Sequence, residues 1–184
     1  MKPRQIPNAL CVLRMLMVAP IAWLLLRGEY GWVLLLFFIA GFTDGLDGYL
    51  AKTFDWRTRL GGILDPLADK LLLVTVFATL AWVGLAPIWL FAAVIIRDAI
   101  IVAGATGYRL LIGEFEAGPT RISKFNSALQ LVYVLAAVAE AGFGTPGRPV
   151  VDVIGYGVLA TTAVSGIDYM VTWGIRARRE YQAR

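Results

Sequence analysis

Histidine is absent from this chain of 184 residues, and cysteine occurs only once, as Cys11. Without histidine, the chain lacks both the usual general base of enzymes and their commonest nitrogen ligand for metals. A single cysteine excludes a disulfide within the chain and a thiolate metal cluster. Any chemistry must therefore use carboxylates, hydroxyls, lysine and arginine. A metal held by carboxylates alone would be a hard cation such as Mg²⁺, Mn²⁺ or Ca²⁺.

Charged residues are also scarce: they make up 16% of the chain, whereas hydrophobic residues make up 59%. Soluble domains are typically about 45–50% apolar, and uncharged runs of roughly 20 residues are typical of membrane-spanning helices. We therefore expect an all-α, polytopic membrane protein that forms a single domain over residues 1–184. Its six predicted transmembrane helices cover residues 8–27, 31–52, 60–84, 87–112, 122–142 and 150–175.

Basic residues are distributed unevenly between the two sets of loops. Twelve of the 17 lysines and arginines lie in the N-terminus, the second loop, the fourth loop and the C-terminus, whereas the opposite loops hold only Arg27 and Arg148. Positively charged loops remain on the cytoplasmic side, so both termini should be cytoplasmic. This requires an even number of spans, and six fits. We expect a multi-pass protein of the cell's inner, cytoplasmic membrane. The net charge of +4 fits its anionic surface and requires no nucleic-acid partner.

The first ten residues, MKPRQIPNAL, precede most of the first span. Two interpretations remain open for them: a short interfacial helix that lies on the membrane surface, or a disordered basic tail.

Four aspartates interrupt the apolar pattern. Asp44 and Asp47 are three residues apart in the second span, and Asp65 and Asp69 are four apart in the third, so each pair shares one helix face. A rise of 1.5 Å per residue places all four at similar depth, just inside the cytoplasmic end of their spans. An unpaired charge at mid-membrane costs at least ~2.5 kcal/mol. Four carboxylates at one depth are therefore expected to bind one or two divalent cations.

Two alternatives exist for the aspartates. The first is that intramembrane ion pairs with Arg14, Lys70 and Arg97 neutralise them without any metal. The second is that they line the pore of a divalent-cation channel or carrier. Transport would need polar residues across the whole membrane, but the remaining halves of both spans, YGWVLLLFFIAG and LLLVTVFATLAWVG, are almost entirely apolar. The carboxylates therefore favour a one-sided pocket.

The aspartate pattern resembles the hallmark of the CDP-alcohol phosphatidyltransferases. That hallmark reads D-x-x-D-G-x-x-A-R, eight or nine further residues, then G-x-x-x-D-x-x-x-D. The spacing is matched here by Asp44, Asp47, Gly48, Ala51, Gly61, Asp65 and Asp69. One position departs, because Lys52 stands where the family has arginine. The charge is kept, but the two-pronged contact that arginine makes with phosphate is lost.

Three further segments are similar to the eukaryotic-type cardiolipin synthase branch of this family: IPNALCVLR at 6–14, IRDAIIVAGATGYRL at 96–110 and RISKFNSALQL at 121–131. The related phosphatidylglycerophosphate synthases tend to have Arg-Glu at 97–98 and Gly-Lys-x-Lys-Thr at 123–127. The resemblance implies transfer of a phosphatidyl group from CDP-diacylglycerol to phosphatidylglycerol, giving cardiolipin and CMP. The alternative acceptor is glycerol-3-phosphate.

The same resemblance implies roles for individual residues. Asp44, Asp47 and Asp65 would hold Mg²⁺ or Mn²⁺, with one or two ions per site. Asp69 would ligate or lie near the second ion and accept the proton of the attacking hydroxyl. The donor-binding residues would be Asn8, Gly48, Ala51, Lys52 and Gly61, although Asn8 could simply cap the first helix.

The acceptor needs cationic contacts of its own, and Arg97, Arg121 and Lys124 are the candidates. Arg97 lies within the fourth span, where a charge usually has a partner or a ligand. It could instead form an ion pair with Asp98. Arg121 and Lys124 could equally be ordinary basic anchors at the cytoplasmic surface. The family resemblance further implies a homodimer.

Overall fold

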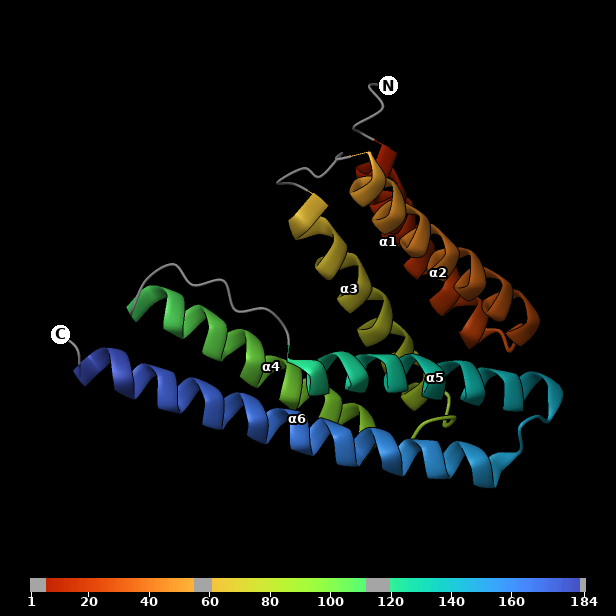
Figure 1. Cartoon of the computed structure of the whole chain (residues 1–184). Coiled ribbons are helices and arrows are strands. Elements are labelled where there is room, and N and C mark those ends of the chain that lie inside the picture. The colour runs from red at the N-terminus through yellow and green to blue at the C-terminus, as the bar shows by residue number, and fades with distance from the viewer. Residues whose placement is uncertain (1–5, 55–60, 112–119, 183–184) are drawn as a thin grey trace. The chain divides into compact units, whose positions relative to one another are not determined.

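The structure is a computed structural model that describes residues 6–54, 61–111 and 120–182 (Figure 1). These residues form helices and turns, with no strand among them, which confirms the predicted all-α class for this part of the chain. The helices are α1 (Ile6–Leu26), α2 (Tyr30–Thr53), α3 (Gly61–Trp82), α4 (Ile88–Leu111), α5 (Arg121–Phe143) and α6 (Arg148–Gln182). Several side chains within these helices lie outside the described residues, among them Asn8, Asp47, Gly48, Ala51 and Lys52.

The helix ends lie within two residues of the predicted spans, except that α6 continues to Gln182 rather than ending near residue 175. Gly28 and Gly84, two residues after the ends of α1 and α3, adopt positive φ angles of 74° and 79°, and glycine reaches this backbone region without steric cost. Residues 6–10 form the first turns of α1, so this part of the N-terminal segment is neither a separate interfacial helix nor a disordered tail. Residues 1–5 lie outside the described residues.

The chain divides into two compact units. The first unit comprises residues 1–86 and 134–148, and therefore contains α1, α2, α3 and the end of α5. The second unit comprises residues 87–133 and 149–184, and contains α4, the beginning of α5 and α6. The prediction of a single domain over residues 1–184 stays a prediction.

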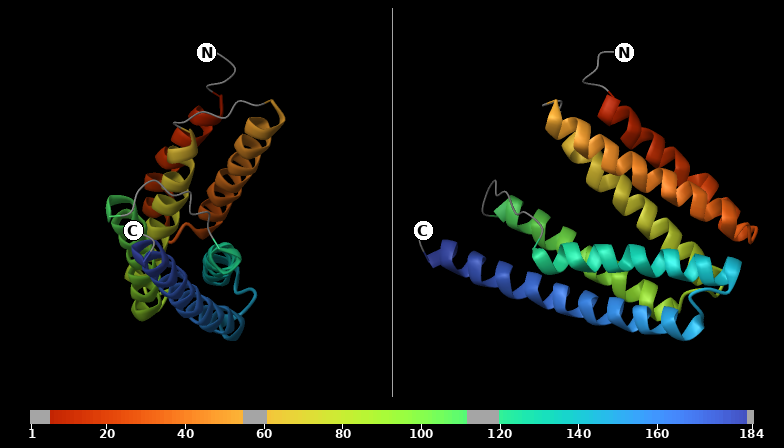
Figure 2. Two further views of the ribbon diagram at one scale, coloured as in Figure 1. Left: turned by 60° about the vertical axis from the view of Figure 1, so that its left-hand side comes forward. Right: turned by 45° about the vertical axis from the view of Figure 1, so that its right-hand side comes forward.

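In the first unit, α1 packs against both α2 and α3, as Figures 1 and 2 show. The core contains Ile21 of α1, Val33 and Phe37 of α2, and Val76 and Phe77 of α3, all nearly inaccessible to solvent. Lipid tails are as apolar as these side chains, so inside a membrane the close packing of the helices, rather than escape from water, would hold them together.

In the second unit, the buried side chains of α4, α5 and α6 include Leu90, Tyr133 and Val158, which are at most 2% exposed. Gly155 permits a close approach between α6 and α5. A Cβ atom at position 155 would lie 3.0 Å from the Tyr133 ring, closer than most real Cβ contacts. A glycine at this point therefore lets α6 lie directly against α5.

The outer surfaces of the helices carry large apolar side chains, such as Leu16, Phe38 and Val153, each more than two-thirds exposed. Apolar surface of this extent is unusual on a soluble monomer. Among the described residues, three helices are long and apolar enough to cross a membrane: α1 over Ala9–Leu26, α5 over Arg121–Phe143 and α6 over Arg148–Thr172. The segment Tyr30–Leu46 of α2 is a shorter apolar helix. The number of spans and their orientation stay predictions.

Candidate active site

The first candidate site is built on the buried face of α1. Cys11, Arg14, Val18, Ile21 and Leu25 recur every three or four residues and are all buried, as expected for one stripe of a helix. Arg14 is the one charged residue in this stripe, and it is only 1% exposed. A buried guanidinium is costly unless it is paired. The position of Arg14 therefore requires acidic partners on the helices that cover α1.

Asp44 of α2 and Asp69 of α3 are those partners. Nη1 of Arg14 lies 2.6 Å from Oδ1 of Asp44 and 2.5 Å from Oδ1 of Asp69. One nitrogen therefore contacts carboxylates from two helices. The Arg14 side chain is buried, whereas the side chains of Asp44 and Asp69 are 49% and 51% exposed. Each carboxylate thus has a protein cation on one side and remains accessible on the other.

Asp65 lies one turn before Asp69 on α3. Its Oδ1 accepts a hydrogen bond from the Cys11 thiol at 2.5 Å. Cys11 contacts Asp65, and Arg14, one turn further along α1, contacts Asp69. The order of these contacts shows that α1 and α3 run in the same direction in the first unit. The predicted shared face of Asp65 and Asp69 is confirmed by their common neighbour α1.

These carboxylates are chemically suited to a divalent cation. Asp44 and Asp69 converge on one positive nitrogen, so their oxygens already surround a cationic position, and carboxylate oxygens are the ligands that Mg²⁺ and Mn²⁺ prefer. The single charge of Arg14 cannot balance three aspartates. No group of three or more candidate ligands in metal-binding arrangement is found among the described residues. The side chain of Asp47, the fourth predicted ligand, lies outside them.

The second candidate site lies in the second unit, around Arg97 of α4. Nη2 of Arg97 donates to the hydroxyls of Ser123 on α5, at 2.6 Å, and Ser165 on α6, at 2.5 Å. Nη1 contacts Asp98 at 2.9 Å, which is the ion pair considered from the sequence. The guanidinium carbon also lies 6.0 Å from the centre of the Tyr169 ring. Arg97 is 8% exposed, so it is a buried cation that joins three helices.

A polar stripe on α5 continues from Ser123 through Asn126 to Gln130, all less than one-tenth exposed. Oδ1 of Asn126 accepts hydrogen bonds from Thr161 at 2.7 Å and Thr162 at 3.0 Å, both on α6. The side-chain nitrogens of Asn126 and Gln130 are buried and find no hydrogen-bond partner among the described residues. Buried polar groups normally have partners, so these two side-chain amides could still donate hydrogen bonds.

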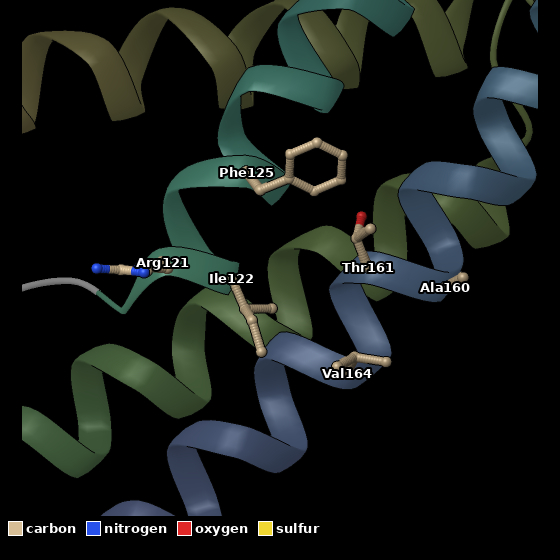
Figure 3. A pocket seen from close by; sticks show the side chains of 6 residues that line it. All are labelled: Arg121, Ile122, Phe125, Ala160, Thr161 and Val164. Atoms are coloured by element: carbon tan, nitrogen blue, oxygen red, sulfur yellow. The ribbon is translucent and has the colours of Figure 1, made fainter.

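A groove of about 390 Å³ lies beside this stripe, between the beginning of α5 and the middle of α6. Figure 3 shows its lining residues, which are Arg121, Ile122, Phe125, Ala160, Thr161 and Val164. In this view the Arg121 side chain extends away from the other five. Arg121 and Lys124 are both exposed. The contacts described here link Arg97 to serines and to Asp98, and do not link it to either of these basic residues.

The structure therefore brings together only some of the predicted residues. Asp44, Asp65 and Asp69 meet at α1, and Gly61 is buried at the beginning of α3. The predicted alternative of intramembrane ion pairs is confirmed for Arg14, which contacts Asp44 and Asp69. Arg97 contacts the neighbouring Asp98 instead.

The sequence interpretation missed several site residues. Cys11 is a neutral residue in an apolar run, and its position gave no indication of a contact with Asp65. The serines that bind Arg97 and the amides of α5 could have been found. Ser123, Asn126 and Gln130 recur every three or four residues within a predicted span, and such a polar stripe indicates a buried network.

Comparison with known proteins agrees with these motifs. The family model described as CDP-alcohol phosphatidyltransferase matches residues 4–173. The chain belongs to the CDP-alcohol phosphatidyltransferase family, as the aspartate pattern predicted.

Three relatives illustrate the range of named activities. The human protein named cardiolipin synthase (CMP-forming) is 31% identical over 183 residues, covering 91% of this chain and 61% of its own length. A protein of the same name from Streptomyces coelicolor is 36% identical over 103 residues, 53% of this chain and 48% of the relative. The CDP-diacylglycerol–glycerol-3-phosphate 3-phosphatidyltransferase of Bacillus subtilis is 34% identical over 139 residues, 73% of this chain and 69% of the relative. The chain thus spans about three-fifths of the length of the human protein.

Proposed function

We propose that this protein transfers the phosphatidyl group of CDP-diacylglycerol to phosphatidylglycerol, which yields cardiolipin and CMP. One observation carries the proposal. Asp44 and Asp69, the first and last aspartates of the family pattern, contact the same buried cation while half of each side chain stays exposed. An accessible cluster of carboxylates in a family of phosphatidyltransferases is suited to a metal-dependent reaction at a diphosphate. The human and Streptomyces relatives named cardiolipin synthase support the choice of acceptor.

Asp44, Asp47, Asp65 and Asp69 would hold the divalent cation, Mg²⁺ or Mn²⁺, with room for two ions if all four contribute. When bound, the metal would neutralise the diphosphate of the donor and stabilise the departing CMP. The carboxylates are contributed by two helices that both pack on α1. Their spacing is therefore set by rigid elements, as a preorganised site requires.

Asp69 would act as the general base. The acceptor hydroxyl oxygen forms a bond to the phosphatidyl phosphorus, the bond from that phosphorus to the oxygen of the CMP phosphate breaks, and the hydroxyl proton passes to the Asp69 carboxylate. A carboxylate is the natural proton acceptor in a chain without histidine. The half-exposed position of Asp69 gives a bound hydroxyl access to it.

Donor contacts would come from Asn8, Gly48, Ala51, Lys52 and Gly61. Gly61 is the first residue of α3, one turn before Asp65, and its lack of a side chain would let the donor approach the backbone. Lys52 would offer a single ammonium to the diphosphate, a weaker grip than the fork of the arginine usual in the family.

Acceptor contacts would come from Arg97, Arg121 and Lys124. Arg97 is buried among hydroxyls that can rearrange around an anion. Arg121 and Lys124 are exposed in the first turn of α5, where they could meet the phosphate of a lipid headgroup. The groove between α5 and α6 begins at Arg121 and offers an apolar surface to the tails of the same lipid.

The membrane setting completes the proposal. Three described helices are apolar enough to span a membrane, and the basic loops favour six spans with both termini and the active site at the cytoplasmic face of the inner membrane. A homodimer is proposed on the family resemblance alone.

A second candidate function uses glycerol-3-phosphate as acceptor and gives phosphatidylglycerophosphate. The observation that favours it is the Bacillus subtilis relative, whose name states this activity and of which the chain covers 69%. The metal and the donor chemistry would be unchanged.

One experiment separates the two functions. Purified protein in detergent micelles would receive labelled CDP-diacylglycerol, a divalent cation and either phosphatidylglycerol or glycerol-3-phosphate. The lipid product and the released CMP would both be identified. Cardiolipin supports the first function, and phosphatidylglycerophosphate supports the second. If neither acceptor released CMP above the level of an Asp44→Asn variant, both functions would be wrong.

A further inference from the structure

Arg14 occupies the place where the proposed metal site needs positive charge. Its Nη1 lies 2.6 Å from Oδ1 of Asp44 and 2.5 Å from Oδ1 of Asp69, so one nitrogen contacts one oxygen of each of these two proposed metal ligands. Arginine stays protonated at every pH at which proteins are folded. The charge of Arg14 cannot be removed by deprotonation when a metal arrives.

A divalent cation and this guanidinium would compete for the same oxygens. Mg²⁺ binds carboxylate oxygens at roughly 2.0–2.1 Å, well inside the distances that Arg14 keeps. A cation held by the Asp44 and Asp69 carboxylates would therefore come close to the Arg14 guanidinium, and two like charges in a poorly screened site repel strongly. The long side chain of Arg14, unlike the α2 and α3 backbones that carry the aspartates, can withdraw by changing rotamers.

In the protein without metal, Arg14 would reduce the repulsion between the carboxylates. Without a cation, Asp44 and Asp69 would lie close together beside α1 as two like charges, and Asp65 would add a third one turn from Asp69. Arg14 relieves this repulsion. Its burial is in turn tolerated because the carboxylates pair with it.

We propose that Arg14 is a built-in counter-cation of the metal site: it holds Asp44 and Asp69 together in the metal-free protein and is displaced from them by the divalent ion. The inference rests on the metal-dependent function proposed above and assigns a role to a residue of α1 outside the aspartate motif. It follows that Arg14 stabilises the metal-free protein and lowers its affinity for metal.

The test measures metal binding directly, without turnover. Mn²⁺ would be titrated into the full-length protein in detergent, without substrate, and free Mn²⁺ followed by electron paramagnetic resonance. The variants are Arg14→Gln, which is neutral but still donates hydrogen bonds, and Arg14→Lys, which keeps the charge. Arg27→Gln is the matched control. It removes one positive charge from a residue that stacks on Trp23, about 20 Å further along the chain direction of α1.

We expect Arg14→Gln to bind Mn²⁺ roughly tenfold more tightly or better than the wild type, since a close repulsive charge has been removed. Arg14→Lys and Arg27→Gln should stay within about threefold of the wild type, because the local charge is kept or was distant. Thermal unfolding should show the linked effect. Without metal, Arg14→Gln should unfold at a lower temperature than the wild type. Added Mn²⁺ should raise its unfolding temperature by more than it raises that of the wild type.

Each of the following results would overturn the inference. Equal or weaker Mn²⁺ binding by Arg14→Gln would mean that Arg14 supports the bound metal or does not affect it, while the proposed function would stand. The absence of Mn²⁺ binding in every protein, the wild type included, would remove the metal site itself and the inference with it. If Arg14→Gln does not fold, Asp69→Asn provides a background with one carboxylate fewer. There, adding Arg14→Gln should tighten Mn²⁺ binding relative to Asp69→Asn alone, and failure to do so would equally overturn the inference.

Discussion

Arg14 of α1 and Asp69 of α3, separated by 55 residues along the chain, are joined by a contact of 2.5 Å between Nη1 and Oδ1. The same nitrogen contacts Asp44 of α2, so this arginine fixes the positions of two helices relative to α1. Asp44 and Asp69 both touch Arg14, yet the proposed chemistry gives them different tasks. Substitutions that keep their size can separate those tasks.

Asp69→Asn keeps the size of the side chain and one metal-binding oxygen, but it cannot accept the hydroxyl proton. Turnover should fall by roughly 10²-fold or more, the usual scale for loss of a general base, while binding of CDP-diacylglycerol should change far less. Asp44→Asn should instead weaken binding of the metal and the donor together. The measurement compares donor affinity and turnover in both variants. Normal turnover in Asp69→Asn would assign the proton to another acceptor, and loss of donor binding equal to that of Asp44→Asn would make Asp69 primarily a ligand.

Removal of divalent metal should abolish activity. The described carboxylates converge on a cationic position, and no histidine is present in the chain to replace the metal as an electrophile. Activity in EDTA should therefore vanish and return on addition of Mg²⁺ or Mn²⁺. Product formation is measured before and after dialysis against the chelator, with a chelator already saturated with Mg²⁺ as the control. Full activity in thoroughly metal-depleted protein would rule out the proposed mechanism.

The sequence was sufficient for the helices and for part of the site. Apolar runs predict the helix ends because hydrophobic length is a local property of the sequence. The shared face of Asp65 and Asp69 follows from helical periodicity. Contacts between helices are different: which aspartate Arg14 meets depends on the rotation and register of three helices, and periodicity within one helix does not determine either.

In the second unit, too, the contacts between helices could not be predicted from the sequence. The sequence indicates that Arg97 is a charge within a span and needs partners. The hydroxyls of Ser123 and Ser165, which accept hydrogen bonds from its Nη2, come from segments 26 and 68 residues away. Hydroxyl residues are common in transmembrane helices, where they bond across helices. Their presence alone does not identify the cation they serve.

The uneven distribution of basic residues predicts cytoplasmic loops at 54–59 and 113–120. Single cysteines introduced there, for example by Arg57→Cys and Glu114→Cys, should not react with a membrane-impermeant thiol reagent in intact cells but should react after lysis. Cys11 must first be replaced by serine, because it is the chain's own thiol. Thr145→Cys, in the loop after α5, is the control and should be labelled from outside. Labelling of either cytoplasmic position in intact cells would reverse the orientation and move the proposed site to the other face.

Gly142 in the last turn of α5 should be intolerant of a side chain. A Cβ atom at this position would lie 2.8 Å from Cβ of Tyr30 on α2, and neither group can rotate away. Gly142→Ala should therefore lower stability by about 1–3 kcal/mol, the usual cost of overpacking. Gly41→Ala is the matched control in the same unit, since nothing lies within 4 Å of its Cβ position, and alanine favours a helix over glycine by up to about 1 kcal/mol. Thermal unfolding in detergent compares the two. Equal stability of both variants would mean that the end of α5 does not pack on Tyr30.

Arg97 should control the acceptor rather than the donor. Its Nη1 contacts Asp98, and its Nη2 contacts Ser123 and Ser165. Arg97→Lys keeps the charge, but a single ammonium cannot reproduce this fork. A hydrogen bond to a charged group contributes about 1.5–3 kcal/mol. The KM for the acceptor should therefore rise roughly tenfold or more, with little change in the KM for CDP-diacylglycerol. Steady-state kinetics with each substrate varied in turn gives both values.

Ser127→Ala is the control. The Ser127 hydroxyl donates to the Ser123 carbonyl rather than to Arg97, so this variant should keep both KM values near those of the wild type. An equal rise of both KM values in Arg97→Lys would indicate a general loss of structure, and a rise for the donor alone would place Arg97 on the other substrate.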